Sequence, residues 1–312
     1  MNIARCLAAF LVAMALFDLS QAQHYPPTFS QSVSYAVGDQ VQLNGNVLRA
    51  THAVTPGTFK YDEWELWEVR SNTTVMIGVS QTFPTLPAAW NYVHNARIAD
   101  GAYLHLYIST VHGLYNETLS APFSLDQSSG SAISLLGDTE SNVNLSFTST
   151  KGFVIDSGHS FASVSNLTLN GANTGEGGFY ASGGASISNI AGCSISGFSS
   201  EIYADTNASI SVGPGMAYAS YIKAALTADN AGTITAPNVA ITSSSSQVGV
   251  GLWALRNGVI NAYGASLANL FRGASAEQGG LIFMESSRVS GCSIGCYADM
   301  PAGLSWSSAT LG

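Results

Sequence analysis

A column of acidic residues is the most evident source of chemistry in this sequence. A short pattern recurs seven times between Ile155 and Leu304, and the position after its first residue holds a carboxylate in five of the seven copies. The seven residues at this position are Asp156, Ser182, Asp205, Asp229, Leu255, Glu277 and Asp299. Only 9% of the chain is charged, so the concentration of acids stands out. Repeated carboxylates predict proton-transfer chemistry or the binding of a hard cation such as Ca²⁺.

The acids form two pairs from consecutive copies, Asp205 with Asp229 and Glu277 with Asp299. If consecutive copies stack at a strand spacing of roughly 5 Å, each pair has the separation of the carboxyl groups in a retaining glycosidase. Like charges this close would raise one pKa and create a proton donor. The same pairs could instead chelate Ca²⁺, or they could be turn-favouring residues without a chemical role.

Basic and aromatic residues accompany the acids. Arg256, with Lys223 and Arg272 as further candidates, could act as the base of a polysaccharide lyase, or Arg256 could be an ion-pair partner of the acids. In four copies an aromatic residue precedes the first position of the pattern: Tyr180, Tyr203, Trp253 and Tyr297. In a strand, a ring and a carboxylate two residues apart project from one face, which favours a surface that stacks against sugars.

The repeat itself predicts the fold. Successive copies, such as Ala204-Asp-Thr-Asn-Ala208-Ser-Ile210, begin 22 to 26 residues apart, which is typical of a solenoid. Apolar residues two apart indicate strands. We therefore predict an all-β chain folded as a right-handed parallel β-helix; the alternative, a β-sandwich, does not repeat its sequence.

Two ladders follow from the stacking of the copies. The apolar residues that end the copies would form one interior ladder, made of Ile187, Ile210, Ile234, Ile260, Ile282 and Leu304. The Ala or Gly two residues before each of them would mark a tight corner.

Residues 1–22 have the pattern of a secretory signal peptide, with Arg5 before an apolar core and Ser20-Gln-Ala22 at the cleavage site. We expect a secreted protein with no membrane span after cleavage. The net charge of −9 argues against nucleic acid as a partner. Of the remaining cysteines, we expect Cys193 to be an unpaired core residue, and only Cys292 and Cys296 are close enough to pair. No spacing of Cys or His indicates a bound metal.

Residues 23–70 read as a small aromatic β module, in which Asn44-Gly45 joins two strands. The sequence Tyr35-Ala-Val-Gly38-Asp39-Gln-Val41, the Gly turn and the closing Trp64 and Trp67 resemble the short chitin-binding-type carbohydrate modules. The resemblance implies that Tyr35, Trp64 and Trp67 stack on sugar rings. These aromatic residues could equally supply the core of the module.

Residues 71–152 are expected to hold a capping helix, from Thr82 to Val93, and the first turns of the β-helix, and residues 153–312 its regular turns. Thr82-Phe83-Pro-Thr-Leu86, Arg97-Ile-Ala-Asp-Gly101, Gly113-x-Tyr115 and Leu135-Leu-Gly137-Asp138 resemble phage tail-fibre and tailspike proteins with a pectate-lyase-like β-helix.

That resemblance implies a homotrimeric appendage that faces glycans, placed in the virion tail if the chain is encoded by a phage. The hypotheses are a protein that binds surface polysaccharide, a polysaccharide depolymerase (a lyase or a glycoside hydrolase), and an exported structural adhesin.

Overall fold

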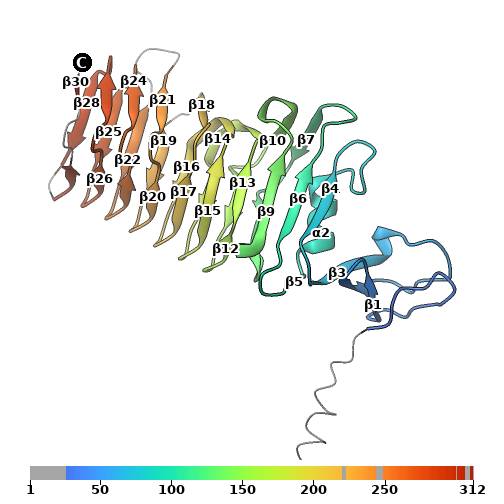
Figure 1. Ribbon diagram of the computed structural model, residues 1–312. Helices are drawn as coiled ribbons and strands as arrows, with labels where there is room; N and C mark the ends of the chain where they lie inside the picture. Colours follow the sequence, from blue (N-terminus) through green and yellow to red (C-terminus); the bar gives the residue numbers. More distant parts are fainter. Residues whose placement is uncertain (1–25, 220–222, 244–248, 300, 306–309, 312) are drawn as a thin grey trace, which may run out of the picture.

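The computed structural model describes residues 26–219, 223–243, 249–299, 301–305 and 310–311. The predicted signal peptide lies outside these residues. The described chain is a small N-terminal β module followed by a long solenoid of parallel strands (Figure 1). None of the described helices is long and apolar enough to cross a membrane.

The N-terminal module is a four-stranded sheet in the order β1 (Gln40–Leu43), β2 (Asn46–Ala50), β3 (Trp64–Val69) and β5 (Arg97–Ile98). Asn44 and Gly45 join β1 to β2 with φ values of 52° and 83°, the left-handed pair that a tight hairpin turn requires. The predicted hairpin is thus confirmed. A short 3₁₀ turn, Tyr61–Glu63, precedes β3.

Helix α2 (Leu86–Val93) lies at the N-terminal end of the solenoid (Figure 1). The hydroxyl of Thr85 caps it by accepting the N–H of Ala88 at 3.3 Å. The predicted helix began earlier, at Thr82, but the residues up to Thr85 are not helical. The ring of Trp90 packs 5.7 Å from that of Phe123, so the helix covers the interior of the first turns.

Each turn of the solenoid, here called a rung, contributes strands to three faces, and every strand pair within the solenoid is parallel. Face 1 contains β7 (Tyr115–Leu119), β10 (Val143–Phe147), the first parts of β14 (Thr168–Ala181) and β16 (Ser194–Ala204), β18 (Ala217–Ala219), β21 (Ala240–Thr242), β24 (Ser266–Ala268), β27 (Arg288–Ser290) and β30 (Thr310–Leu311). Face 2 contains β8 (Phe123–Ser124), β11 (Lys151–Ile155), the second parts of β14 and β16, β19 (Ala224–Ala228), β22 (Val250–Ala254), β25 (Arg272–Ala276) and β28 (Ile294–Ala298).

Face 3 contains β4 (Thr73–Ile77), β6 (Leu104–Ile108), β9 (Ile133–Gly137), β12 (Ser160–Phe161), β13 (Ser163–Ser165), β15 (Ser186–Ala191), β17 (Ser209–Val212), β20 (Thr233–Thr235), β23 (Val259–Asn261), β26 (Leu281–Phe283) and β29 (Gly303–Ser305). Short 3₁₀ turns at Gly130–Ala132 and Glu140–Asn142 link early strands. The predicted all-β parallel β-helix is confirmed.

The predicted interior ladder is present in register on face 3. Ile187 pairs with Ile210, and the pairing continues through Ile234, Ile260 and Ile282 to Leu304. Phe161 extends the ladder by one rung toward the N-terminus. All members except the last are buried, so this ladder forms part of one continuous core.

The corner between faces 2 and 3 is a tight turn that starts at the acidic position. In the rung of Asp229, the next two residues, Asn230 and Ala231, have φ values of 45° and 62°, and the N–H of Gly232 donates to the carbonyl of Asp229 at 2.7 Å. A Cβ on Gly232 would lie 2.2 Å from the carbonyl oxygen of Ala204, so this rung requires glycine there. The predicted tight corner is confirmed, and it presents each acidic residue at the same edge of face 2.

Cys193, Cys292 and Cys296 form no disulfide with one another. Cys193 is buried in the core as predicted, and Cys292 and Cys296 do not pair.

Candidate functional site

An aromatic column runs along the outside of face 2, next to the acidic corner. The residues in register along it are Val154, Tyr180, Tyr203, Thr227, Trp253, Ser275 and Tyr297. The four aromatic residues that the sequence placed beside the acids therefore do form one column, with gaps at Thr227 and Ser275. The rings of Tyr180 and Tyr203 stack at 5.3 Å between centroids, with 14° between their planes.

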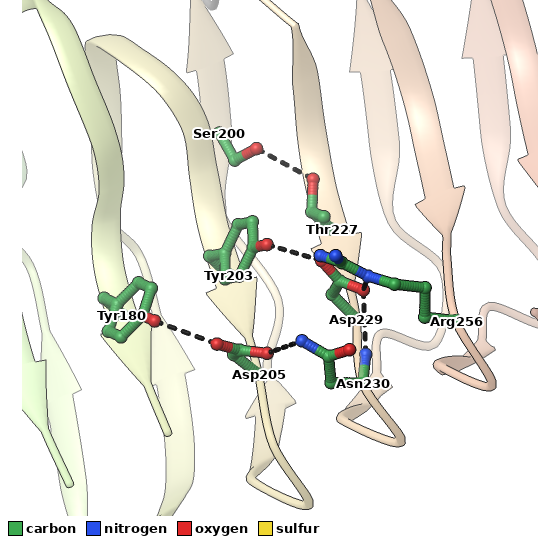
Figure 2. Close-up of polar contacts among 8 residues, drawn as sticks. All are labelled: Tyr180, Ser200, Tyr203, Asp205, Thr227, Asp229, Asn230 and Arg256. Atoms are coloured by element: carbon green, nitrogen blue, oxygen red, sulfur yellow. Dashed lines mark hydrogen bonds and ion pairs between the residues drawn. The ribbon is translucent and has the colours of Figure 1, made fainter. Parts of the chain in front are cut away.

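The aromatic side chains donate hydrogen bonds to the acids of the following rung, which Figure 2 shows for the two tyrosines. The three bonds are Tyr180 Oη to Asp205 at 3.0 Å, Tyr203 Oη to Asp229 at 2.7 Å and Trp253 Nε1 to Glu277 at 3.2 Å. Burial is the largest cause that raises the pKa of Tyr180 and of Tyr203, and the neighbouring carboxylates add to it. Both phenols therefore keep their protons and act as donors at neutral pH.

Asp229 is the most enclosed acid of the column, with its side chain 1% exposed. Arg256 donates to it through Nε at 2.7 Å and also through Nη2, while the N–H of Asn230 adds a bond of 2.8 Å. Burial alone would raise the pKa of Asp229, but the hydrogen bonds from Arg256, Tyr203 and Asn230 outweigh it and hold the pKa below its ordinary value. Asp229 is therefore not the member of its pair that repulsion would turn into a proton donor.

Arg256 forms an ion pair with Asp229 of the acidic column. Of its two predicted roles, lyase base and ion-pair partner, the structure has the second. Its hydrogen bonds and charge interaction with Asp229 raise the pKa of the guanidinium, which therefore stays protonated and cannot accept a sugar proton. The guanidinium is anchored on a buried acid while the Arg256 side chain is 53% exposed. This arrangement leaves N–H groups available to a ligand.

Asp205 lies one rung before Asp229 and makes different contacts. It accepts hydrogen bonds from Tyr180 and from Asn230 Nδ2, the latter at 2.8 Å (Figure 2). The two acids of this predicted pair are thus close neighbours along the column, but only Asp229 has a cationic partner among the described residues.

The two acids of the second predicted pair, Glu277 and Asp299, accept hydrogen bonds from different residues. Glu277 accepts from Ser275 at 2.7 Å and from Arg272 at 2.8 Å, and it forms an ion pair with that arginine. Asp299 accepts from the N–H of Gln278 at 2.8 Å. The guanidinium carbon of Arg272 lies 4.2 Å from the centre of the Tyr297 ring, a cation–π contact.

A hollow of about 370 Å³ opens on face 2 over this part of the column. The residues that line it are Glu176, Tyr180, Ser199, Ser200, Tyr203, Asp205, Lys223, Thr227, Asp229, Trp253, Leu255 and Arg256. Ser200 and Thr227 are buried and hydrogen-bonded to each other at 2.8 Å, so they form a polar floor (Figure 2). The sequence did not reveal this floor, although the break in the aromatic column at Thr227 was a visible sign of it.

The aromatic residues of the N-terminal module are placed differently from the prediction. Tyr35 is 7% exposed and Trp64 is 2% exposed, and their rings pack at 5.2 Å in a cluster with Phe29. The prediction that Tyr35 and Trp64 stack on sugars is wrong, because a module this small uses them as its core. Trp67 is partly exposed, and the guanidinium of Arg49 covers its ring at 3.7 Å.

One group of possible metal ligands exists among the described residues, and it lies away from the hollow. Asp126, Asp156 and His159 bring one ligand atom each within 4.8 Å of one another. The Asp126 carboxylate already accepts the N–H of Asp156 at 2.8 Å and the hydroxyl of Ser124. These contacts explain the cluster as part of the corner structure. The predicted Ca²⁺ pairs are not part of a larger ligand group in the described part of the chain.

Comparisons of the chain with protein-family models, with curated proteins and with solved structures find no match.

Proposed function

We propose that this protein binds surface polysaccharide, and that the hollow on face 2 is its binding site. The observation that carries the proposal is the column of partly exposed aromatic rings with carboxylate and guanidinium groups beside them. Aromatic rings bury the apolar faces of sugar rings, while charged groups bind hydroxyls with high directionality. Export, which the signal-peptide pattern of residues 1–22 predicts, and assembly as a homotrimer, which the resemblance to tailspike proteins implies, belong to this proposal.

The repetition of the column suits a polymeric ligand. Rungs succeed one another at roughly 4.8 Å, so a chain of sugars that lies along the solenoid axis meets similar groups at regular intervals. Tyr180, Tyr203 and Trp253 line the hollow, and Tyr297 continues the column beyond it toward the C-terminus. A surface of this kind binds several sugar units weakly rather than one unit tightly.

Depolymerisation is the second candidate, and the adjacency of Asp205 and Asp229 in one hollow favours it. Hydrolysis requires one carboxyl group that carries a proton. Asp229 is a poor choice, because its oxygens accept bonds from Tyr203, Arg256 and Asn230 and its pKa is lowered. Asp205 would have to be the acid, with Glu277 as the alternative on the same face. We therefore favour binding without cleavage.

A glycan array together with a polysaccharide digestion assay tests both candidates. We expect retention of glycans without shortening, and weaker binding by about threefold to tenfold in Tyr203→Ala and in Trp253→Ala, because each loses one stacking contact. Trp67→Ala, in the N-terminal module, is the control and should bind as the wild type does. Polymer shortening that disappears in Asp205→Asn or Glu277→Gln would instead establish a depolymerase.

A further inference from the structure

The two gaps in the aromatic column are not equivalent. At the second gap, on the rung of Ser275, the guanidinium of Arg272 occupies the space left by the small residue. It lies over the Tyr297 ring and donates to Ser275 at 3.1 Å and to Glu277 at 2.8 Å. The protein therefore fills this gap with a flat, charged group of its own.

At the first gap, on the rung of Thr227, the arginine comes from the next rung, where Arg256 is held on Asp229 at the edge of face 2. Along the ladder, Arg272 is in register with Val250, which is in register with Ala224, so alanine takes the place of the arginine on this rung. Tyr203 and Trp253 flank the gap and are two rungs apart, or roughly 10 Å by strand spacing. The Tyr203 ring is nearly parallel to that of Tyr180, so its other face is turned toward the gap. Thr227 is only 1% exposed, so a sugar ring would lie above the covered threonine, against the exposed parts of Tyr203 and Trp253.

The charges around the hollow leave one cation unpaired. Glu176 forms an ion pair with Lys151 at 3.1 Å, and Asp229 forms one with Arg256. Lys223 is exposed and lines the hollow, and its side chain has no hydrogen bond or ion pair among the described residues. It is the only cation lining the hollow whose side chain has no partner among the described residues, so an anionic group on a ligand would find a partner there.

The distribution of cations over the solenoid agrees with this. From Leu104 onward the sequence contains five Lys and Arg residues: Lys151, Lys223, Arg256, Arg272 and Arg288. The first four belong to face 2 or its edges, and only Arg288 is on face 1. Face 2 also carries the acidic column, and Lys151, Arg256 and Arg272 are ion-paired with Glu176, Asp229 and Glu277. Lys223 is thus the one of these four cations whose side chain has no ion-pair partner among the described residues.

We propose that the gap above Thr227 is a subsite for a sugar unit that carries a carboxylate, with its ring between Tyr203 and Trp253 and its carboxylate on Lys223 and Arg256. The inference rests on the proposed glycan binding and adds the class of ligand, an acidic polysaccharide. Asp229 is a positioning residue here, because it anchors Arg256 and is itself too buried to meet the ligand.

The test starts from an array of oligosaccharides that contain uronate or sialate, with neutral oligosaccharides beside them. The best acidic binder is then compared with its carboxyl-reduced form by titration of the full chain. We expect acidic glycans to be retained and carboxyl reduction to weaken binding about tenfold or more, because a charge-assisted contact is lost. Retention of neutral glycans alone, with loss in Tyr203→Ala, would overturn the acidic subsite and leave the proposed function standing. Retention of no glycan would overturn both.

Three variants locate the subsite. Thr227→Tyr continues the aromatic column with a ring of the protein's own and should abolish binding, as Arg272 closes the second gap. Lys223→Ala changes an exposed side chain, so the fold is kept, and it should weaken binding of the acidic glycan about tenfold but leave binding of its reduced form unchanged. Arg288→Ala removes a cation from face 1 and is the matched control. Equal affinity of Lys223→Ala and wild type for the acidic glycan would contradict the proposal.

Discussion

At the scale of single residues, the site depends on donors that reach across one rung. Tyr203 and Arg256 approach Asp229 from the preceding and the following rung, so the buried carboxylate joins three rungs. The sequence placed these residues in one neighbourhood but could not assign their contacts. Whether a tyrosine meets the acid of its own rung or the next depends on side-chain length and rotamer, which a repeat pattern does not encode.

The lowered pKa of Asp229 predicts how stability depends on pH. A carboxyl group whose pKa is lower in the folded state stabilises that state above its unfolded pKa, near 4, and loses the contribution as the pH falls through the folded value. In urea unfolding, we expect wild type to be more stable than Asp229→Asn at pH 7, and the difference to shrink below about pH 4. A difference that is constant from pH 7 to pH 3 would show that the ionised carboxylate is not the stabilising species.

At the scale of elements, each rung is set by ladders of identical or similar residues. The Ile ladder from Ile187 to Ile282 was readable because its members recur at one position of a regular period and stack directly. The tight corner between faces 2 and 3 was predictable for the same reason, because its Ala or Gly recurs at one position of the repeat. Tyr35 and Trp64 were misread because they belong to the one part without a repeat, where only tertiary packing decides which aromatic residue is buried.

The interior ladder predicts a large difference between neighbouring positions of β20. Ile234→Ala removes a fully buried side chain and leaves a cavity, so we expect the free energy of unfolding to fall by about 2 to 5 kcal/mol. Thr233→Ala, one residue away and directed outward, should change it by less than about 0.5 kcal/mol. Denaturant unfolding followed by circular dichroism measures both. Similar effects for the two variants would mean that the assigned register is wrong.

At the scale of the whole molecule, the solenoid is a stack whose first strands need a cover. Strand β4 ends the sheet of face 3, and helix α2 packs beside it through Leu86 and Ala89, which are fully buried. The cap was predictable from the spacing of apolar residues in Thr82 to Val93. Its exact start was not predictable from the sequence. The prolines at 84 and 87 are both tolerated in the first turn of a helix, so the pattern allows a start before or after Thr85.

The cap predicts the association behaviour of the protein. Leu86→Asp places a charge in the contact between α2 and the solenoid and should loosen the helix, which exposes the edge of β4 to other copies. We expect larger species in sedimentation velocity at equal protein concentration. Asn91→Asp introduces the same charge at an exposed position of α2 and should leave the size distribution as in wild type. If both variants sediment as wild type does, α2 does not protect the end of the stack.

The central claim, that face 2 holds a glycan over Thr227, is tested most directly by calorimetric titration with the glycan that the array selects. Wild type is compared with the double variant Tyr203→Ala, Trp253→Ala, and both are first shown by circular dichroism to have the same β content. The account predicts saturable binding to wild type and a loss of at least tenfold in the double variant, because both walls of the gap are removed. Equal affinities in the two proteins would contradict it.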